Sequence, residues 1–364
     1  MKIAILGTRG IPNHYGGFEQ FAEYISIDLV KKGHEVTVYN SHLHPYQEKE
    51  WKGVSIIHKY DSENRIGTAG QFIYDLNCIL DCRRRGFDII LQLGYTSSSI
   101  WGRFLPKKAR IITNMDGLEW KRTKYSKNVQ TFLLYAEKLA VKFSDHLVAD
   151  SIGIKEYLRQ KYLVDATYIP YGTEVVNNFE LLYLEEYGLK PESFLLLIAR
   201  LEPENSIEII LDGYLKKKSE LPFLVIGNYK TKYGQYLVHK YSFSKSIRFL
   251  GGIYDIKKLN VLRRYCSYYF HGHTVGGTNP SLLEAMGSGA FICAHDNIFN
   301  YSILKENALY FTSSDDVVDI LSSDNSKRKE KYRFKNLEKA QKLYSWNTIA
   351  DSYEELFTRT LNKR

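Results

Sequence analysis

The stretch that decides the fold is HGHTVGGTNPSLLEAMGSG, residues 271–289. It follows SYYF (residues 267–270), a short aromatic run typical of the end of a buried strand. Within it, PSLLEAM has the pattern of the first turns of a helix, with Asn279 at the N-cap and Pro280 at the first helical position, where a missing N–H costs nothing. The stretch therefore predicts a strand, a glycine loop and a helix in succession.

The loop of this unit, which includes Gly276, Gly277 and Thr278, offers backbone N–H groups and no bulky side chains. Unpaired N–H groups and the helix dipole attract an anion to such an N-terminus. Ser281 and Glu284 follow in the helix, where a carboxylate at Glu284 suits a ribose diol. These residues predict a nucleotide-diphosphate site, and the alternative is a glycine loop that only tightens a turn.

The composition describes a soluble globular protein. The 364 residues favour two domains, and the hydrophobic and charged contents are 44% and 25%. No apolar run approaches the roughly 18 residues of a membrane-spanning helix. The four cysteines lack metal-type spacing, and the N-terminus has the pattern of a strand rather than a signal peptide, so we expect a reduced, cytoplasmic chain. The net charge of +9 permits nucleic acid, an anionic membrane or phosphorylated substrates as partners.

Strands alternate with helices along the chain, which predicts parallel, doubly wound α/β sheets. The pattern begins at KIAILG (residues 2–7) and restarts at FLLLIAR (residues 194–200). We therefore expect two Rossmann-like domains, residues 1–172 and 173–344, facing a central cleft. The amphipathic segment 345–364 forms a C-terminal helix.

The first glycine loop does not match a dinucleotide site. It lacks the G-x-G-x-x-G spacing, and the second strand ends at Asn40 instead of an acidic residue, so a dehydrogenase is disfavoured. Gly16 and Gly17 could still approach a phosphate closely, with Arg9 supplying charge. The alternative is a loop of structural use only.

Two further residues end predicted strands. Arg200 follows the first strand of the second half, where a guanidinium can pair with a diphosphate, although a surface ion pair with Glu202 or Glu204 is an equal alternative. Asp116, in the first half, can orient sugar hydroxyls or take a proton, although an Asp before Gly is more often a turn residue.

Metal and nucleic-acid sites are not indicated. His271 and His273 have no third ligand in sequence range, and the chain contains no Asp-x-Asp pair. No compact nucleic-acid-binding module is recognisable. Basic residues are interleaved with aromatic ones, which could rest on an anionic membrane or meet a lipid diphosphate; a solvated basic face is the more ordinary interpretation. The basic residues are Arg103, Lys107, Lys108, Arg110, Lys121, Arg122, Lys124 and Lys127, and the aromatic ones are Trp101, Phe104, Trp120 and Tyr125.

Taken together, the motifs resemble the retaining glycosyltransferases of family four, which have the GT-B fold. ARLEPEN (199–205), FLGGIYD (249–255), residues 276–289 and SWNTIADSYEELF (345–357) carry this resemblance over nearly the whole chain. GTRGIPNHYGGFEQF (7–21) is similar to a subfamily that includes rhamnosyltransferases of bacterial surface-polysaccharide assembly, such as capsule or O-antigen. The resemblance implies a nucleotide-sugar donor on the C-terminal domain, an acceptor on the N-terminal domain, and a final helix that crosses back to the N-terminal domain.

The family's site residues are matched in part. Glu284 matches the second glutamate of its E-x7-E pattern, the ribose ligand, whereas the first glutamate is replaced by Gly276. Arg200 matches the arginine that faces the diphosphate, but the partner lysine is replaced by Asn205. Gly16 and Gly17 match the N-terminal glycine loop. Asp116 lies where the family often has a histidine near the donor sugar.

These departures suggest how the donor is held. Without the lysine, Arg200, the helix at Pro280 and Arg9 would stabilise the leaving group. Without the first glutamate, backbone and small side chains of the four residues from Gly276 to Asn279 would contact the sugar hydroxyls, which suits a 6-deoxy sugar because it offers fewer polar groups.

The sequence thus predicts a metal-independent retaining glycosyltransferase without a cofactor. The best match is transfer of L-rhamnose from dTDP-rhamnose to a lipid-diphosphate-linked saccharide, at the cytoplasmic face of the membrane. The alternatives are a hexosyltransferase that uses UDP-glucose, UDP-galactose or a GDP-sugar, a nucleotide-sugar 2-epimerase, and a basic anion-binding protein without enzymatic activity.

Overall fold

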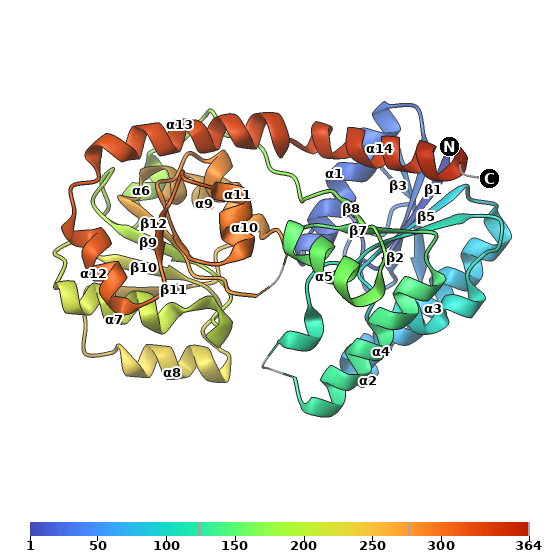
Figure 1. Cartoon of the computed structure of the whole chain (residues 1–364), viewed down its shortest axis with the longest axis horizontal. Helices are drawn as coiled ribbons and strands as arrows, with labels where there is room; N and C mark the ends of the chain where they lie inside the picture. Colours follow the sequence, from blue (N-terminus) through green and yellow to red (C-terminus); the bar gives the residue numbers. More distant parts are fainter. Residues whose placement is uncertain (123–124, 276, 363–364) are drawn as a thin grey trace. The chain divides into compact units, whose positions relative to one another are not determined.

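The computed structural model describes residues 1–122, 125–275 and 277–362, and it divides into two compact units (Figure 1). The first unit comprises Met1–Gly172 and Trp346–Arg364, and the second comprises Thr173–Ser345. Lys124 of the basic run and Gly276 of the glycine loop lie outside the described residues. Within the described residues, no helix is long and apolar enough to cross a bilayer.

The first unit is built on a sheet whose strands lie in the order β3-β4-β2-β1-β5-β6-β7-β8, parallel except for β3. The strands are β1 (Lys2–Leu6), β2 (Glu35–Ser41), β3 (Glu50–Trp51), β4 (Val54–Lys59), β5 (Ile89–Leu93), β6 (Arg110–Asn114), β7 (His146–Ala149) and β8 (Thr167–Tyr168). The α-helices are α1 (Gly17–Lys31), α2 (Glu63–Ile66), α3 (Gly70–Arg85), α4 (Lys127–Phe143), α5 (Ile152–Tyr162) and α14 (Trp346–Asn362). Short 3-10 helices are η1 (Gly67–Ala69), η2 (Ser98–Phe104) and η3 (Glu119–Lys121).

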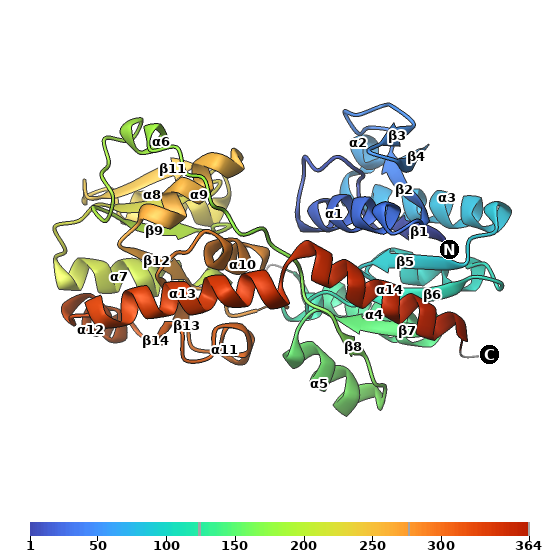
Figure 2. The ribbon, with the colours of Figure 1, turned by 90° about the horizontal axis from the view of Figure 1, so that it is seen from above.

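Helices cover both faces of this sheet. The α3 helix packs its buried side chains on β1, β5 and β6, and η2 and α4 continue the same layer. The other layer holds α1, against which α14 packs (Figures 1 and 2). Trp346 of α14 stacks on Tyr24 of α1 with ring centroids 4.7 Å apart, and Tyr353 of α14 packs edge-on against Phe21. The last helix thus belongs to the core of the first unit.

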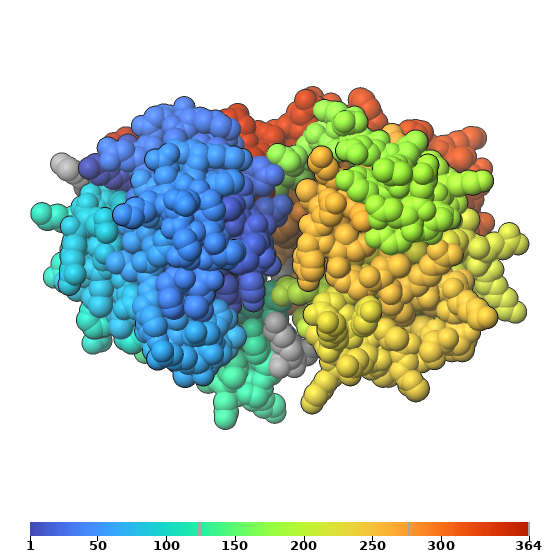
Figure 3. Space-filling view, turned by 180° about the vertical axis from the view of Figure 1, so that it is seen from behind, coloured from blue at the N-terminus to red at the C-terminus, as the bar shows by residue number. Residues whose placement is uncertain are grey.

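The second unit holds a fully parallel sheet in the order β11-β10-β9-β12-β13-β14. The strands are β9 (Leu195–Ile198), β10 (Phe223–Ile226), β11 (Ile247–Gly251), β12 (Tyr268–His271), β13 (Ile292–His295) and β14 (Leu309–Phe311). The helices are α6 (Leu182–Glu185), η4 (Pro203–Asn205), α7 (Ile207–Lys217), α8 (Lys232–Lys240), α9 (Ile256–Tyr265), α10 (Pro280–Gly287), α11 (Ile298–Leu304), α12 (Ser314–Ser322) and α13 (Ser326–Leu343). The α7 and α12 helices pack together in one layer, α9, α10 and α13 form another, and α8 lies at the surface (yellow in Figure 3).

Both sheets have the doubly wound arrangement that the alternating pattern predicts. Local signals also hold: Asn279 caps α10 by accepting a hydrogen bond from Ser281 N at 2.9 Å, and Ser151 caps α5 through Ile154 N at 3.2 Å. Several elements were not predicted from the sequence, among them β3, β4, α8, α11, β14 and α12, none of which is longer than nine residues.

Candidate functional site

The order of strands in the second unit locates a ligand site. From β9 the chain runs outward to β10 and β11, and it then returns to β12 on the opposite side of β9. In doubly wound sheets, ligands bind outside the carboxyl ends of the strands at this switch point. Arg200 follows β9 and His271 ends β12, so the two loops that carry most of the predicted residues meet there.

Backbone and amide contacts join these two loops. The side-chain amide of Asn205 donates to the carbonyl oxygen of Arg200 at 2.6 Å, and Thr274 donates from its N and Oγ1 to the carbonyl of Glu204 at 3.0 and 2.8 Å. A Cβ on Gly272 would lie 2.0 Å from the carbonyl oxygen of Asn205, so this close approach requires glycine. Asn205 is buried and contributes an amide that fixes the loop of Arg200.

Arg200 itself is exposed. Within the described residues its guanidinium forms no ion pair, either with Glu202 or Glu204 or with any other acidic residue. The surface ion pair that the sequence left open is therefore not formed. An uncompensated cation at the switch point can pair with a phosphate group.

The residues that precede α10 are less available than the sequence suggests. Thr278 is buried, and the side-chain oxygen of Asn279 is occupied by the helix cap. The hydroxyl of Ser281 lies 2.8 Å from that of Tyr269 on β12. These side chains hold the loop and the helix N-terminus in place against the strand.

Glu284 lies one turn inside α10 and forms an ion pair with Arg263 of α9. Their atoms Oε2 and Nη2 are 2.5 Å apart, and Arg263 also donates to Asn260 Oδ1 at 3.2 Å. The side chain of Arg263 is 1% exposed, whereas that of Glu284 is 19% exposed. Arg263 thus holds the carboxylate from the protein side, and about a fifth of the Glu284 side chain stays accessible to solvent.

His271 is a buried polar group at the end of β12. Within the described residues neither ring nitrogen has a hydrogen-bond partner, and the ring stacks on His273 with centroids 4.3 Å apart. Burial, together with His273 and Arg263, holds the pKa of His271 well below its ordinary value. The imidazole is therefore neutral at physiological pH.

In the first unit, a buried carboxylate organises the loop between β1 and α1. Glu19 Oε1 accepts hydrogen bonds from Thr8 Oγ1 at 3.1 Å and from Arg9 N at 2.8 Å. Asn40, at the position where a dinucleotide fold has an acidic residue, bonds both backbone groups of Ile11 at 3.0 and 2.8 Å. Asn40 therefore fixes this loop.

Gly16 and Gly17 lie at the N-terminus of α1, where Gly16 is the N-cap residue and Gly17 the first helical one. Arg9 nearby is not a free charge: it pairs with Glu63 through Nε at 2.9 Å and Nη2 at 2.6 Å, and its guanidinium lies 3.9 Å from the centroid of the Tyr15 ring. The charge that the sequence analysis assigned to a phosphate is thus compensated within the protein.

Asp116 follows β6 in a left-handed backbone conformation, with φ of 48°. Its N–H donates to Asn114 Oδ1 at 2.9 Å. Burial raises the pKa of Tyr95 and Tyr171, and the Asp116 carboxylate raises both further. Burial lowers the pKa of Arg122, but Glu119 and Asp116 raise it above its ordinary value. A non-glycine residue held at positive φ stores strain of about 1–3 kcal/mol, which is typical of turns and of functional sites.

One buried acid in this unit escaped the sequence analysis. Asp75 of α3 accepts a hydrogen bond from Ser97 Oγ, and burial, with a further contribution from Asp61, raises its pKa to about 7, although Ser97 and Arg9 lower it. The sequence around Asp75 does not predict its burial, because its partner Ser97 is 22 residues away and is brought to it only by the fold.

Two sheets of this kind, each doubly wound and each with its own core, define the GT-B fold. Residues 1–174 match a family model described as a domain of unknown function, DUF1972. No curated protein matches the chain.

Several solved structures share the fold across their whole length. Sucrose-phosphate synthase from Thermosynechococcus elongatus is 14% identical with a TM-score of 0.79, and 98% of each chain is covered. HepE from Anabaena, in complex with UDP and glucose, is 14% identical with a TM-score of 0.75, and 98% of this chain and 99% of HepE are covered. An α,α-trehalose 6-phosphate synthase from Burkholderia multivorans is 11% identical with a TM-score of 0.73, over 98% and 96% of the two chains.

Proposed function

We propose that this chain is a retaining glycosyltransferase that takes a sugar from a nucleoside-diphosphate donor. The observation that carries the proposal is the pair of charged groups at the switch point of the second unit. Arg200 offers an exposed guanidinium without an ion pair within the described residues, and Arg263 holds Glu284, whose side chain is 19% exposed. The full-length likeness to GT-B structures, one of them in complex with UDP and glucose, supports the same proposal.

In this proposal each group has a distinct task. Glu284 accepts a hydrogen bond from the sugar of the nucleoside, which offers the 3′ hydroxyl alone in a dTDP donor and both hydroxyls in a UDP or GDP donor. Arg200 with the N–H groups before α10 stabilises the diphosphate as it leaves. Transfer is front-side, so that the departing diphosphate oxygen takes the proton of the acceptor hydroxyl. In the first unit, the backbone at Gly16 and Gly17 approaches the donor and Asp116 orients the sugar. No divalent metal takes part.

The donor and acceptor follow from the resemblance of the N-terminal stretch. We propose dTDP-rhamnose as the donor and a lipid-diphosphate-linked saccharide of a surface polysaccharide as the acceptor, used at the cytoplasmic face of the membrane. A UDP-hexose is the second candidate, because HepE was solved in complex with UDP-glucose.

Calorimetric titration of UDP, dTDP, GDP and NAD into the metal-free protein tests this function. Selective binding of one nucleoside diphosphate, followed by acceptor-dependent release of that diphosphate from the sugar nucleotide, is the expected result. Conversion of the donor to an isomer without acceptor indicates an epimerase instead. Salt-sensitive binding of polyanions without nucleotide preference indicates an anion-binding protein.

A further inference from the structure

A continuous row of aromatic side chains crosses one layer of the first unit, from α4 over α3 to η2. The rings of Phe132 and Phe72 lie 5.7 Å apart, and those of Trp101 and Phe104 lie 6.1 Å apart. Trp101 Nε1 donates to the carbonyl of Phe72 at 2.8 Å, which joins the two pairs. Phe132 and Phe104 remain 36% and 42% exposed, so both ends of the row face solvent.

The exposed apolar surface extends along α4 and α3. Tyr135, three residues after Phe132, is 55% exposed, and Val129 and Ile73 are also exposed. Each is a large apolar or aromatic side chain on a regular helix, where exposure brings no stability. Gathered next to the aromatic row, they form an apolar patch of the kind that marks an interaction site.

Basic residues outnumber acidic ones in the two segments, 98–110 and 127–143, that border this patch. Residues 98–110 and 127–143 together contain seven basic residues and one acidic residue. The basic residues are Arg103, Lys107, Lys108, Arg110, Lys127, Lys138 and Lys142. The acidic residue, Glu137, is buried and accepts hydrogen bonds from Tyr157, Tyr162 and Lys161. Arg110 pairs with Asp145, and within the described residues the other six basic residues form no ion pair, so the surface carries a net positive charge.

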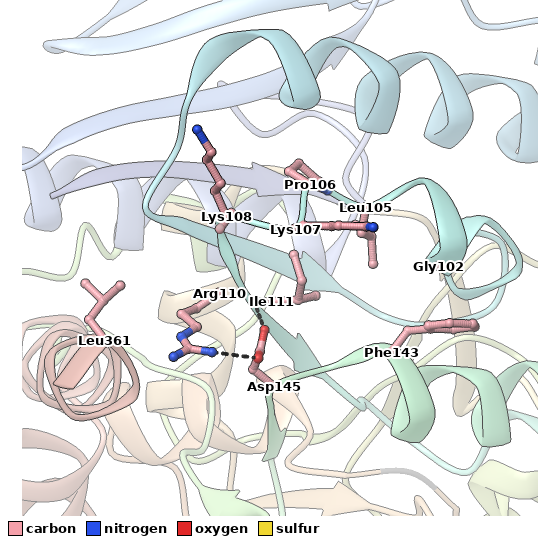
Figure 4. A pocket seen from close by; sticks show the side chains of 11 residues that line it. Gly102, Leu105, Pro106, Lys107, Lys108, Arg110, Ile111, Phe143, Asp145 and Leu361 are labelled. Atoms are coloured by element: carbon pink, nitrogen blue, oxygen red, sulfur yellow. Dashed lines mark hydrogen bonds and ion pairs between the residues drawn. The ribbon is translucent and has the colours of Figure 1, made fainter. Parts of the chain in front are cut away.

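A polar hollow adjoins the patch where η2 ends. It has a volume of about 480 Å³ and is lined by Gly102, Leu105, Lys107, Lys108 and Phe143, among others (Figure 4). Arg110 in its wall pairs with Asp145 at 3.2 Å, whereas neither lysine makes an ion pair within the described residues. A hollow bordered by free ammonium groups can receive a phosphate headgroup.

We propose that this face, called here the α3–α4 surface (Ile73, Trp101, Phe104, Phe132, Tyr135 and the seven basic residues), docks on an anionic membrane. Aromatic side chains enter the headgroup region, while lysine and arginine side chains bind anionic lipids. The inference deepens the proposed function, because it rests on a lipid-linked acceptor and names the surface that brings the enzyme to it.

The charge of the surface decides between a membrane and a second copy of the chain. A two-fold dimer through this face would bring two sets of lysines together, while the carboxylates at the face, Glu137 and Asp145, are already engaged within the unit. A bilayer that contains anionic lipid supplies the opposite charge along its whole area. The α3–α4 surface thus suits a lipid surface and disfavours self-association.

The test is co-sedimentation of the full-length chain with vesicles of phosphatidylcholine alone or with phosphatidylglycerol. Lys138→Gln/Lys142→Gln removes two exposed charges four residues apart on α4, and Lys327→Gln/Lys331→Gln is its matched control, with the same spacing and exposure on α13. Likewise Phe132→Ser is matched by Phe334→Ser, since Phe334 of α13 is 64% exposed.

The wild-type chain should bind the anionic vesicles and lose this binding as salt rises. Because each lysine near an anionic surface contributes about 1 kcal/mol, the α4 lysine pair should weaken binding roughly 30-fold. Phe132→Ser should weaken it about tenfold, and the α13 variants should bind like the wild type.

Equal losses in the α4 and α13 variants, or no binding of the wild type, would overturn the proposal. So would a change in oligomeric state on Phe132→Ser with vesicle binding unchanged, which would assign the face to a second copy. Nucleotide titration separates this outcome from the proposed function. If the protein binds a nucleoside diphosphate but does not bind vesicles, only the proposed membrane docking is refuted.

Discussion

Substitution of Glu284 should destabilise the second unit more than its partial exposure suggests. The carboxylate is paired with Arg263, whose side chain is 1% exposed, at 2.5 Å. Glu284→Gln leaves a buried guanidinium without a counter-charge, and removing one partner of a buried pair costs about 3–5 kcal/mol. We therefore expect the free energy of unfolding to fall by roughly that amount.

The reverse substitution should cost less, because the two partners differ in exposure. Arg263→Met leaves the carboxylate of Glu284, which is 19% exposed and can be partly hydrated, so we expect a loss of about 1–3 kcal/mol. Replacing both residues removes both charges, and buried pairs replaced by neutral groups are often close to neutral in stability. The double variant Arg263→Met/Glu284→Gln should therefore be more stable than Glu284→Gln alone.

Urea denaturation can assign the effect to one unit. All four tryptophans, Trp51, Trp101, Trp120 and Trp346, belong to the first unit, so their fluorescence reports on that unit, whereas far-UV circular dichroism reports on both. Glu284→Gln should lower the midpoint seen by circular dichroism more than the fluorescence midpoint. If the double variant loses as much free energy of unfolding as the two single variants lose together, the two residues are not coupled and the buried pair is refuted.

Ligand binding gives an independent measure of the same carboxylate. If Glu284 accepts hydrogen bonds from the ribose, Arg263→Met should weaken a ribonucleoside diphosphate about tenfold or more while barely changing its 2′,3′-dideoxy analogue. If Arg263→Met weakens both nucleotides equally, Arg263 supports the fold and does not position a carboxylate for the ribose hydroxyls. The wild-type ratio of UDP to 2′-deoxy-UDP affinity also indicates whether both hydroxyls are used, and hence whether a ribose or a deoxyribose donor fits.

The other predictions concern three separate positions. Arg200→Ala should lower kcat by about 10²–10³ with little change in melting temperature, because the side chain is exposed and acts on leaving-group charge; a loss confined to KM would contradict this role. The pKa of Asp75 is raised from 3.8 to about 7 in the folded protein, so between these pH values the folded chain holds a proton that the unfolded chain has released. The free energy of unfolding should therefore fall by up to about 4 kcal/mol as pH rises through this window. Asp75→Asn should flatten that fall in thermal melts between pH 4 and pH 8, and parallel curves for both proteins would show that Asp75 is ionised throughout. Gly272→Ala should cost about 2 kcal/mol or more, because its Cβ would lie 2.0 Å from the carbonyl of Asn205; an unchanged melting temperature would show that the two loops can separate.

Features that depend on neighbours in sequence could be predicted from the sequence. The cap of Asn279, Pro280 at the first position of α10 and the cap of Ser151 are each set within four residues, and the structure confirms them. The alternation of strands and helices also predicted doubly wound sheets, since apolar periodicity records which face of each element is buried. Sheet order then placed Arg200 and the loop before α10 at one edge.

Long-range partners could not be predicted, and they change what the site residues can do. Arg9 and Glu63 are 54 residues apart, and only the approach of α2 to the β1–α1 loop converts a free cation into an ion pair. Arg263 and Glu284 meet because α9 and α10 pack in the same layer, and an arginine in a helix with several basic residues gives no sign of its burial. The same packing makes Glu284 serve two purposes, since the charge that would hold a ribose also neutralises the second unit's core. An activity loss in a Glu284 variant therefore reports on binding only after its effect on folding has been subtracted.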